Sequence, residues 1–244
     1  MGIGIRPTGV DNAAAALRYL ERRQEVSANN LANVSTDGFK GERAFARLLA
    51  DGSTPTAETA TDLRAGTLTA TNNPLDLAIS GKGFLVVQTP TGEKLTRSGA
   101  LHIDDARRLV DVTGNPVLGE TDAQSDATTP IIIPATVKSI TFSSNGAVLA
   151  DGTQIGKLRV EDVPAGAKLQ HEGNGLFAAP AGRTPVGDAD RTVRQGMREE
   201  SNVNSVEAMV DMIAVQRAYA SVQKVMTTID SARGIATTEL GKPV

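Results

Sequence analysis

The stretch Asn29-Asn30-Leu31-Ala32-Asn33-Val34-Ser35-Thr36-Asp37-Gly38-Phe39-Lys40 divides the sequence into two kinds of pattern. Before it, leucines recur at helical spacing, and after it the chain turns to Thr, Gly, Pro and alternating segments. Asparagine is a weak helix former, because its amide competes for nearby backbone groups. The stretch therefore predicts the end of a helix and a joint between two architectures.

The segment before the joint predicts a helix over residues 10–34. Its apolar residues share one arc of a helical wheel, with a heptad-like repeat that Gln24 interrupts. This seam comprises Val10, Ala13, Leu17, Leu20, Ala28 and Leu31.

The three asparagines Asn29, Asn30 and Asn33 lie on the side of this helix opposite the seam. Two interpretations are open: a solvated helix end capped by Gly38 or an asparagine, or amides that hydrogen-bond a neighbouring backbone. Because the asparagines point away from the seam, we favour the second interpretation and expect them to contact other subunits.

Residues 36–74 and 195–202 predict extended linker arms, the first with a short helix near Phe45 to Leu49. Many short strands separated by turns predict an antiparallel β-domain over residues 75–194. The dipeptide Asn145-Gly146 predicts a hairpin with a type I′ turn between residues 140–142 and 147–149.

The helical period returns after Gly196 and predicts a long helix from residue 203 to at least 233, capped by Ser201 or Asn204. Its apolar stripe changes sides halfway along, so one partner helix cannot cover both patches. The first patch holds Val206, Met209, Val210 and Ile213, and the second holds Val215, Tyr219, Val222, Met226 and Ile229. Helices 1–35 and 203–240 are expected to pair as one coiled-coil-like domain, which gives an α+β fold class.

Composition disfavours several classes of function. The net charge of -3 and the scattered basic residues give no field for nucleic acid, and the sequence has no cysteine for a thiolate or metal site. No apolar run approaches the roughly 18 residues of a membrane span. His102 and His171 are the histidines, and each is expected at the surface or in a turn. We therefore expect no enzyme, no cofactor, no metal and no small-molecule substrate.

Four motifs in order resemble the rod and hook axial proteins of bacterial flagella. They are the joint Asn29 to Phe39, the segment Asn73 to Phe84 with Thr96-Arg97-Ser98-Gly99 after it, Gly173 to Phe177, and the region from Ser201 to Tyr219. Within that family the proximal rod subunits are most similar, followed by the distal rod subunits. Arg198 departs from the family pattern, where leucine is common.

The resemblance implies a structural subunit that assembles with copies of itself and other rod proteins into a helical drive shaft transmitting torque from motor to hook. It also implies export by the flagellar type III apparatus without a cleaved signal, and a place in the basal body within the periplasm. The expected assembly interface comprises Leu17, Leu20, Asn29, Asn30, Leu31, Asn33, Phe39, Asn202, Val206, Met209, Val210, Ile213, Val215, Gln216, Arg217, Tyr219, Val222, Met226 and Ile229. The alternatives are a distal rod or hook-type protein, a homo-oligomeric coiled-coil and β binding module, and, last, a secreted hydrolase.

Overall fold

The computed structural model describes residues 9–47, 56–120, 129–164, 166–167 and 169–240. The chain forms two compact units. Unit 1 draws on Met1–Ala32, Glu42–Asp62 and Asn204–Val244, and unit 2 on Asn33–Gly41 and Leu63–Val203. Helices in unit 1 and antiparallel strands in unit 2 confirm the α+β class.

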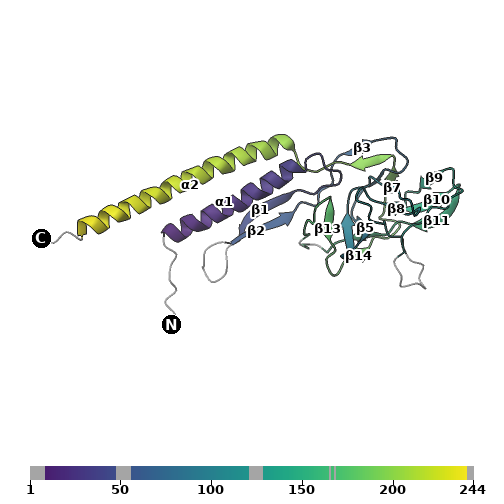
Figure 1. The fold of residues 1–244 in the computed structure, drawn as a ribbon, viewed down its shortest axis with the longest axis horizontal. Helices are drawn as coiled ribbons and strands as arrows, with labels where there is room; N and C mark the ends of the chain where they lie inside the picture. The colour runs from purple at the N-terminus through teal and green to yellow at the C-terminus, as the bar shows by residue number, and fades with distance from the viewer. Residues whose placement is uncertain (1–8, 48–55, 121–128, 165, 168, 241–244) are drawn as a thin grey trace. The chain divides into compact units, whose positions relative to one another are not determined.

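Two helices build most of unit 1: α1 (Gly9–Ala32) and α2 (Ser205–Leu240). They lie side by side and antiparallel (Figure 1), since Ser27 Oγ donates to Asp211 at 2.7 Å while Tyr219 Oη donates to Glu21 at 3.1 Å. The Arg23 guanidinium pairs with the same Asp211. Asn204 caps α2 as predicted, because its Oδ1 accepts the amide N–H groups of residues 206 and 207.

A β-hairpin completes unit 1 and corrects the expected helix near Phe45 to Leu49. Strands β1 (Glu42–Arg47) and β2 (Thr56–Thr61) pair antiparallel, with Phe45 opposite Glu58. Residues 48 and 49 lie outside the described part of the chain. The hairpin contacts α1, and its alternation of small and large side chains explains the strand: Ala44 is half-buried while Arg43 and Phe45 are exposed.

This hairpin also changes the division into domains that the sequence suggested. The arm expected over residues 36–74 is divided, because Glu42–Asp62 belongs to unit 1 while residues 33–41 and 63–74 belong to unit 2. The expected second arm, residues 195–202, also belongs to unit 2, where Gln195 and residues 197–199 pair in strands.

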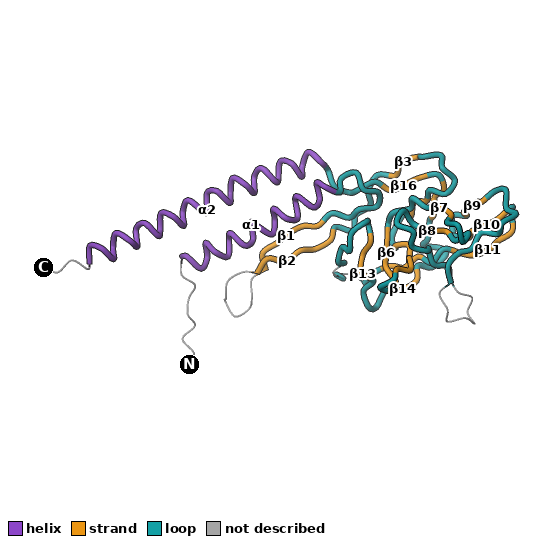
Figure 2. Tube along the Cα trace, viewed as in Figure 1, coloured by secondary structure: helices purple, strands orange, loops and turns teal. Residues whose placement is uncertain are grey.

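Unit 2 consists of short strands joined by long loops (Figure 2). The described strands form a five-stranded sheet of order β13-β6-β5-β12-β14, a three-stranded sheet β11-β10-β9, and the pairs β15-β4, β16-β3 and β7-β8. Their bounds are β3 Leu68–Ala70, β4 Leu77–Ile79, β5 Phe84–Thr89, β6 Gly92–Thr96, β7 His102–Ile103, β8 Leu109–Val110, β9 Ile140–Phe142, β10 Ala147–Ala150, β11 Thr153–Lys157, β12 Val160–Asp162, β13 Leu176–Ala178, β14 Thr184–Pro185, β15 Val193–Gln195 and β16 Met197–Glu199.

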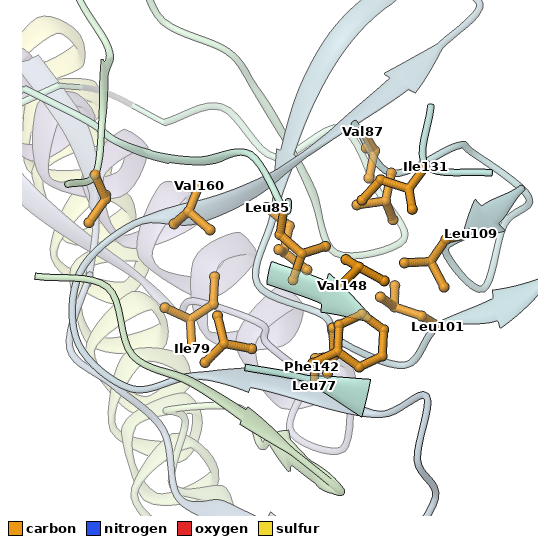
Figure 3. Close-up of a cluster of buried hydrophobic side chains, with 14 of the residues drawn as sticks. Leu77, Ile79, Leu85, Val87, Leu101, Leu109, Ile131, Phe142, Val148 and Val160 are labelled. Atoms are coloured by element: carbon orange, nitrogen blue, oxygen red, sulfur yellow. The ribbon is translucent and has the colours of Figure 1, made fainter. Parts of the chain in front are cut away.

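Strand β5 lies at the centre of the unit 2 core. Its alternate residues enter two apolar clusters: Leu85 and Val87 join one, while Phe84 and Val86 join the other. Figure 3 shows the first cluster, in which Leu85 and Val87 lie near Leu109 and Val148. A continuous apolar run is what a strand buried on both faces requires.

The hairpin at Asn145-Gly146 forms as predicted, but the type I′ turn is wrong. A type I′ turn needs positive φ at both central residues, and here only Gly146 has it, at 85°. The Gly146 N–H donates to the Ser143 carbonyl at 2.9 Å, and the Ser143 N–H donates to Ala147 at 2.9 Å. The loop is therefore longer than two residues, with glycine in its left-handed position.

Candidate functional site

A buried charge cluster holds the joint at the start of unit 2. Lys40 Nζ and Glu199 Oε1 lie 2.5 Å apart, and both side chains are fully buried. Lys40 also donates to the Arg64 carbonyl at 2.8 Å, and the Gly66 N–H donates to Glu199 at 2.9 Å. Arg97 Nε lies 3.4 Å from the second oxygen of Glu199. We call Lys40, Arg97 and Glu199 the junction cluster.

The junction cluster combines two cations with one carboxylate. Burial lowers the pKa of Arg97, while the charges of Glu199 and Asp162 act in the opposite direction. Arg97 also faces the ring of Phe84 at 5.5 Å and donates to the carbonyls of residues 79 and 81. These contacts stabilise a guanidinium that the single carboxylate only partly balances.

Gly38 brings the joint against the backbone of the Thr96-Arg97-Ser98-Gly99 motif. Its φ is +69°, and an added Cβ would lie 2.3 Å from the Arg97 carbonyl carbon. Its N–H donates to the Glu199 carbonyl at 2.6 Å. Gly38 is therefore required for this close approach, and it does not cap α1, which ends at Ala32.

Phe39, the next residue, belongs to an aromatic stack. Its ring lies 4.9 Å from that of His171, which in turn lies 4.6 Å from Phe177. The structure thus differs from the expectation for His171, which packs between two phenylalanines, stacked on Phe39 and tilted against Phe177. His102 is exposed on β7, as expected.

The amides of the joint make hydrogen bonds within their own units. Asn30 donates to the Glu42 carbonyl at 2.8 Å and accepts its N–H at 2.9 Å, so its partner is the hairpin. In unit 2, Asn202 accepts the Gly41 N–H at 2.8 Å and donates to Arg64 at 3.0 Å. Asn33 accepts from Thr36 at 3.2 Å. Asn30 does bond a neighbouring backbone, but that backbone belongs to the same chain.

Helix α2 presents its two apolar patches very differently. The second patch faces α1: Val215 is 1% exposed, and Tyr219, Val222, Met226 and Ile229 are half-buried. The first patch is uncovered, with exposed fractions of 67% at Val206, 51% at Met209, 61% at Val210 and 50% at Ile213. Gln216 and Arg217 beyond it are also exposed. Exposed apolar side chains this closely spaced are typical of interaction surfaces.

The seam of α1 is only partly buried. Leu20 is buried and Leu17 and Leu31 are half-buried, whereas Ala28 and Gln24 are exposed. Asn29 is exposed as well. Val26 is buried on the side that carries Asn30, so α1 is covered from the hairpin side as well as from α2.

Arg198 links two acidic residues of unit 2. Its Nη1 donates to Asp37 at 2.8 Å and its Nε lies 2.9 Å from Asp76 Oδ2. The hydrogen bond that Arg198 donates to Asp37 raises the pKa of Arg198. The charge that departs from the family pattern therefore has two acidic partners, Asp37 in the joint and Asp76 just before β4.

The sequence interpretation did not identify the junction cluster. Lys40 lies at the end of the opening stretch, and Glu199 lies outside the four motifs. Lys40 and Arg97 each lie within two residues of a glycine, but no local feature of the sequence marks Glu199 as their partner. Within the described residues, no group of three His, Cys, Asp or Glu could hold a metal ion, and neither helix is long and apolar enough to cross a membrane.

Three sequence families match the chain. "Flagella basal body rod protein" matches residues 11–40, "Flagellar hook protein FlgE/F/G D1 domain" matches residues 78–150, and "Flagellar basal body rod FlgEFG protein C-terminal" matches residues 194–238. The first match contains the whole joint. The last contains Glu199 and the exposed patch of α2.

Curated relatives match along nearly the whole chain. The flagellar basal-body rod protein FlgF of Escherichia coli (strain K12) is 34% identical, over 92% of this chain and 94% of the relative. FlgF of Salmonella typhimurium is 35% identical, over 92% and 94%. The rod protein FlgG of Agrobacterium fabrum is 31% identical, over 93% and 97%.

Proposed function

Because this chain belongs to the flagellar basal-body rod protein family, we propose that it serves as a proximal subunit of the rod, assembling through the outer surfaces of unit 1. The FlgF relatives quoted above are 34% and 35% identical and the FlgG relative is 31% identical, which supports the proximal over the distal position.

The exposed first patch of α2 is the observation that carries this proposal. A helix with two apolar stripes must be buried twice, and α1 buries only the stripe that holds Val215. The other stripe, from Val206 to Ile213, is left for a neighbour. We propose that the neighbours are copies of this chain and other rod proteins, with the terminal helices packing in a coiled-coil-like manner.

The remaining parts of the proposal rest on the family membership. They are transmission of torque from motor to hook, export through the flagellar type III apparatus, and a periplasmic location of the assembled rod. We further propose that the chain has no catalytic activity, since its relatives carry the name of rod proteins.

Purified basal bodies provide the test. The chain should be detected in them by immunoblotting, and an in-frame deletion of its gene should abolish swimming and leave the rod unfinished. A chain that remains in the cell body while the deletion strain swims normally would contradict the proposal.

A further inference from the structure

Unit 1 has three layers, with α1 in the middle. Figure 1 shows α1 between α2 and the β1–β2 hairpin, and α1 contacts both. The face of α2 that carries Val215 and Asp211 is turned to α1, so the face that carries Val206 and Ile213 is turned outward. The hairpin likewise has one face turned to α1 and one turned outward.

The outward face of the hairpin is identified by strand alternation. Arg43, Phe45 and Arg47 share one face of β1 and are all exposed, whereas Glu42 and Ala44 on the other face are half-buried. Phe45 is 40% exposed, in a chain with only five phenylalanines. An aromatic side chain left at the surface between two arginines is typical of the residues that anchor interfaces.

The outward face of the hairpin carries two arginines that are more exposed to solvent than the acids they pair with. Arg43 pairs with Asp62 and Arg47 with Glu58, each at 3.0 Å. The arginine side chains are 69% and 58% exposed, but their acidic partners are only 15% and 21% exposed. Exposed pairs of this kind are weak and exchange partners at little cost.

The outward face of α2 complements this surface. It offers the apolar side chains Val206, Met209, Val210 and Ile213, and the exposed carboxylate of Glu207 lies beside them. An apolar patch with an adjacent acid matches an exposed phenylalanine flanked by arginines.

We propose that the hairpin of one copy of this chain docks on the α2 patch of a second copy, with Phe45 on Met209 and Val210 and an arginine near Glu207. The two surfaces lie on opposite outer layers of the same unit, so the contact is head-to-tail and repeats from copy to copy. This inference rests on the proposed rod assembly, and it names the contact that joins neighbouring copies.

Cysteine cross-linking tests the contact directly, because the chain has no cysteine of its own. Full-length Phe45→Cys/Met209→Cys protein in purified basal bodies should give, on mild oxidation, a ladder of multiples of the 25.4 kDa chain. Each single variant should stay monomeric, since a head-to-tail contact never brings two identical positions together. The control Phe45→Cys/Lys224→Cys, with the second cysteine on the same exposed side of α2 but beyond the patch, should also stay monomeric.

The outcomes separate this inference from the proposed function. A double variant that is present in basal bodies but gives no ladder overturns the contact and leaves the rod assignment intact. Dimers from either single variant would overturn the head-to-tail geometry. Adducts with another rod protein after photo-cross-linking from position 45, in place of adducts with α2 of a second copy, would overturn the choice of partner. Absence of the chain from basal bodies would instead contradict the proposed function.

Discussion

At the scale of single residues, the junction cluster explains why three distant segments of the chain meet at one point. Lys40 ends the joint, Arg97 lies in the motif after β6, and Glu199 ends β16. A buried carboxylate between two cations is costly to leave unbalanced, because isolated charges are poorly solvated in a protein interior. Each of the two cations in the cluster is therefore stabilised by the carboxylate of Glu199, and the carboxylate by the cations.

Two substitutions in the cluster that preserve side-chain size, Glu199→Gln and Lys40→Met, should lower the free energy of unfolding by different amounts. Glu199→Gln keeps an oxygen for the Gly66 N–H but leaves two buried cations without a carboxylate, and should lower the free energy of unfolding by about 3–5 kcal/mol. Lys40→Met removes one cation and leaves Arg97 and Glu199 as a balanced pair, so the loss should be smaller. Urea unfolding of the purified variants measures both values. An equal or larger loss for Lys40→Met would contradict the role assigned to charge balance.

At the scale of elements, α2 has one apolar face that packs on α1 and a second apolar face that is exposed to solvent. Val215 lies on the buried face and Ile213, two residues before it, on the exposed one. Substitutions at positions 213 and 215 therefore compare an exposed and a buried apolar residue in the same part of one helix.

Val215→Ala should lower the free energy of unfolding of the unassembled protein by about 2 kcal/mol, because it removes buried methyl groups. Ile213→Glu should change it by no more than about 0.5 kcal/mol, since the side chain is exposed, yet it should prevent incorporation into basal bodies. Thermal unfolding and immunoblots of basal bodies measure the two effects. Normal incorporation of Ile213→Glu would show that this face is not an interface.

The loop that joins β10 and β11 gives an element-scale prediction about pH. Hydrogen bonds from the Ser139 and Lys138 N–H groups lower the pKa of Asp151 below its usual 3.8. A depressed folded-state pKa stabilises the protein above the unfolded-state pKa, and this contribution is lost as pH falls through the folded-state pKa.

Asp151→Asn should therefore reduce Tm at pH 7, and the difference from the natural protein should shrink as the pH is lowered below about 4. Asparagine tolerates the positive φ of 48° at this position, so the backbone is preserved. A Tm difference that stays constant from pH 7 to pH 3 would exclude the carboxylate as its cause.

At the scale of the whole molecule, the two units differ in how completely they are buried. Unit 2 has two apolar clusters around β5, whereas Val215 is the one buried residue among those of α2 whose burial is described. Local stability follows burial and contact density. The unassembled chain should therefore be ordered most firmly in unit 2.

Hydrogen exchange followed by mass spectrometry should detect this difference. Peptides of α2 should exchange faster than peptides of β5 and β6 in the unassembled protein, and their protection should increase in purified basal bodies. Equal protection of both units before assembly would mean that the α1–α2 contacts are enough to keep the helices folded without neighbouring subunits.

Much of this arrangement could be predicted from the sequence. The 3.6-residue period fixed the two helices, the amide of Asn204 marked the start of α2, and Asn145-Gly146 predicted the hairpin of β9 and β10. The change of side along the apolar stripe of α2 predicted two separate patches. These features depend on local spacing, which the sequence contains directly.

Other features were decided by contacts between distant segments. The segment from Glu42 to Arg47 forms a strand because β2 pairs with it and α1 covers one face, and Asn30 bonds that strand in place of another subunit. Lys40 and Glu199 are separated by 159 positions along the chain, so only the folded structure brings their charges together. The sequence by itself determined the periodic elements and their apolar faces. The tertiary structure decided which faces are covered and which charges are paired, because burial is a property of the packed chain and not of any one segment.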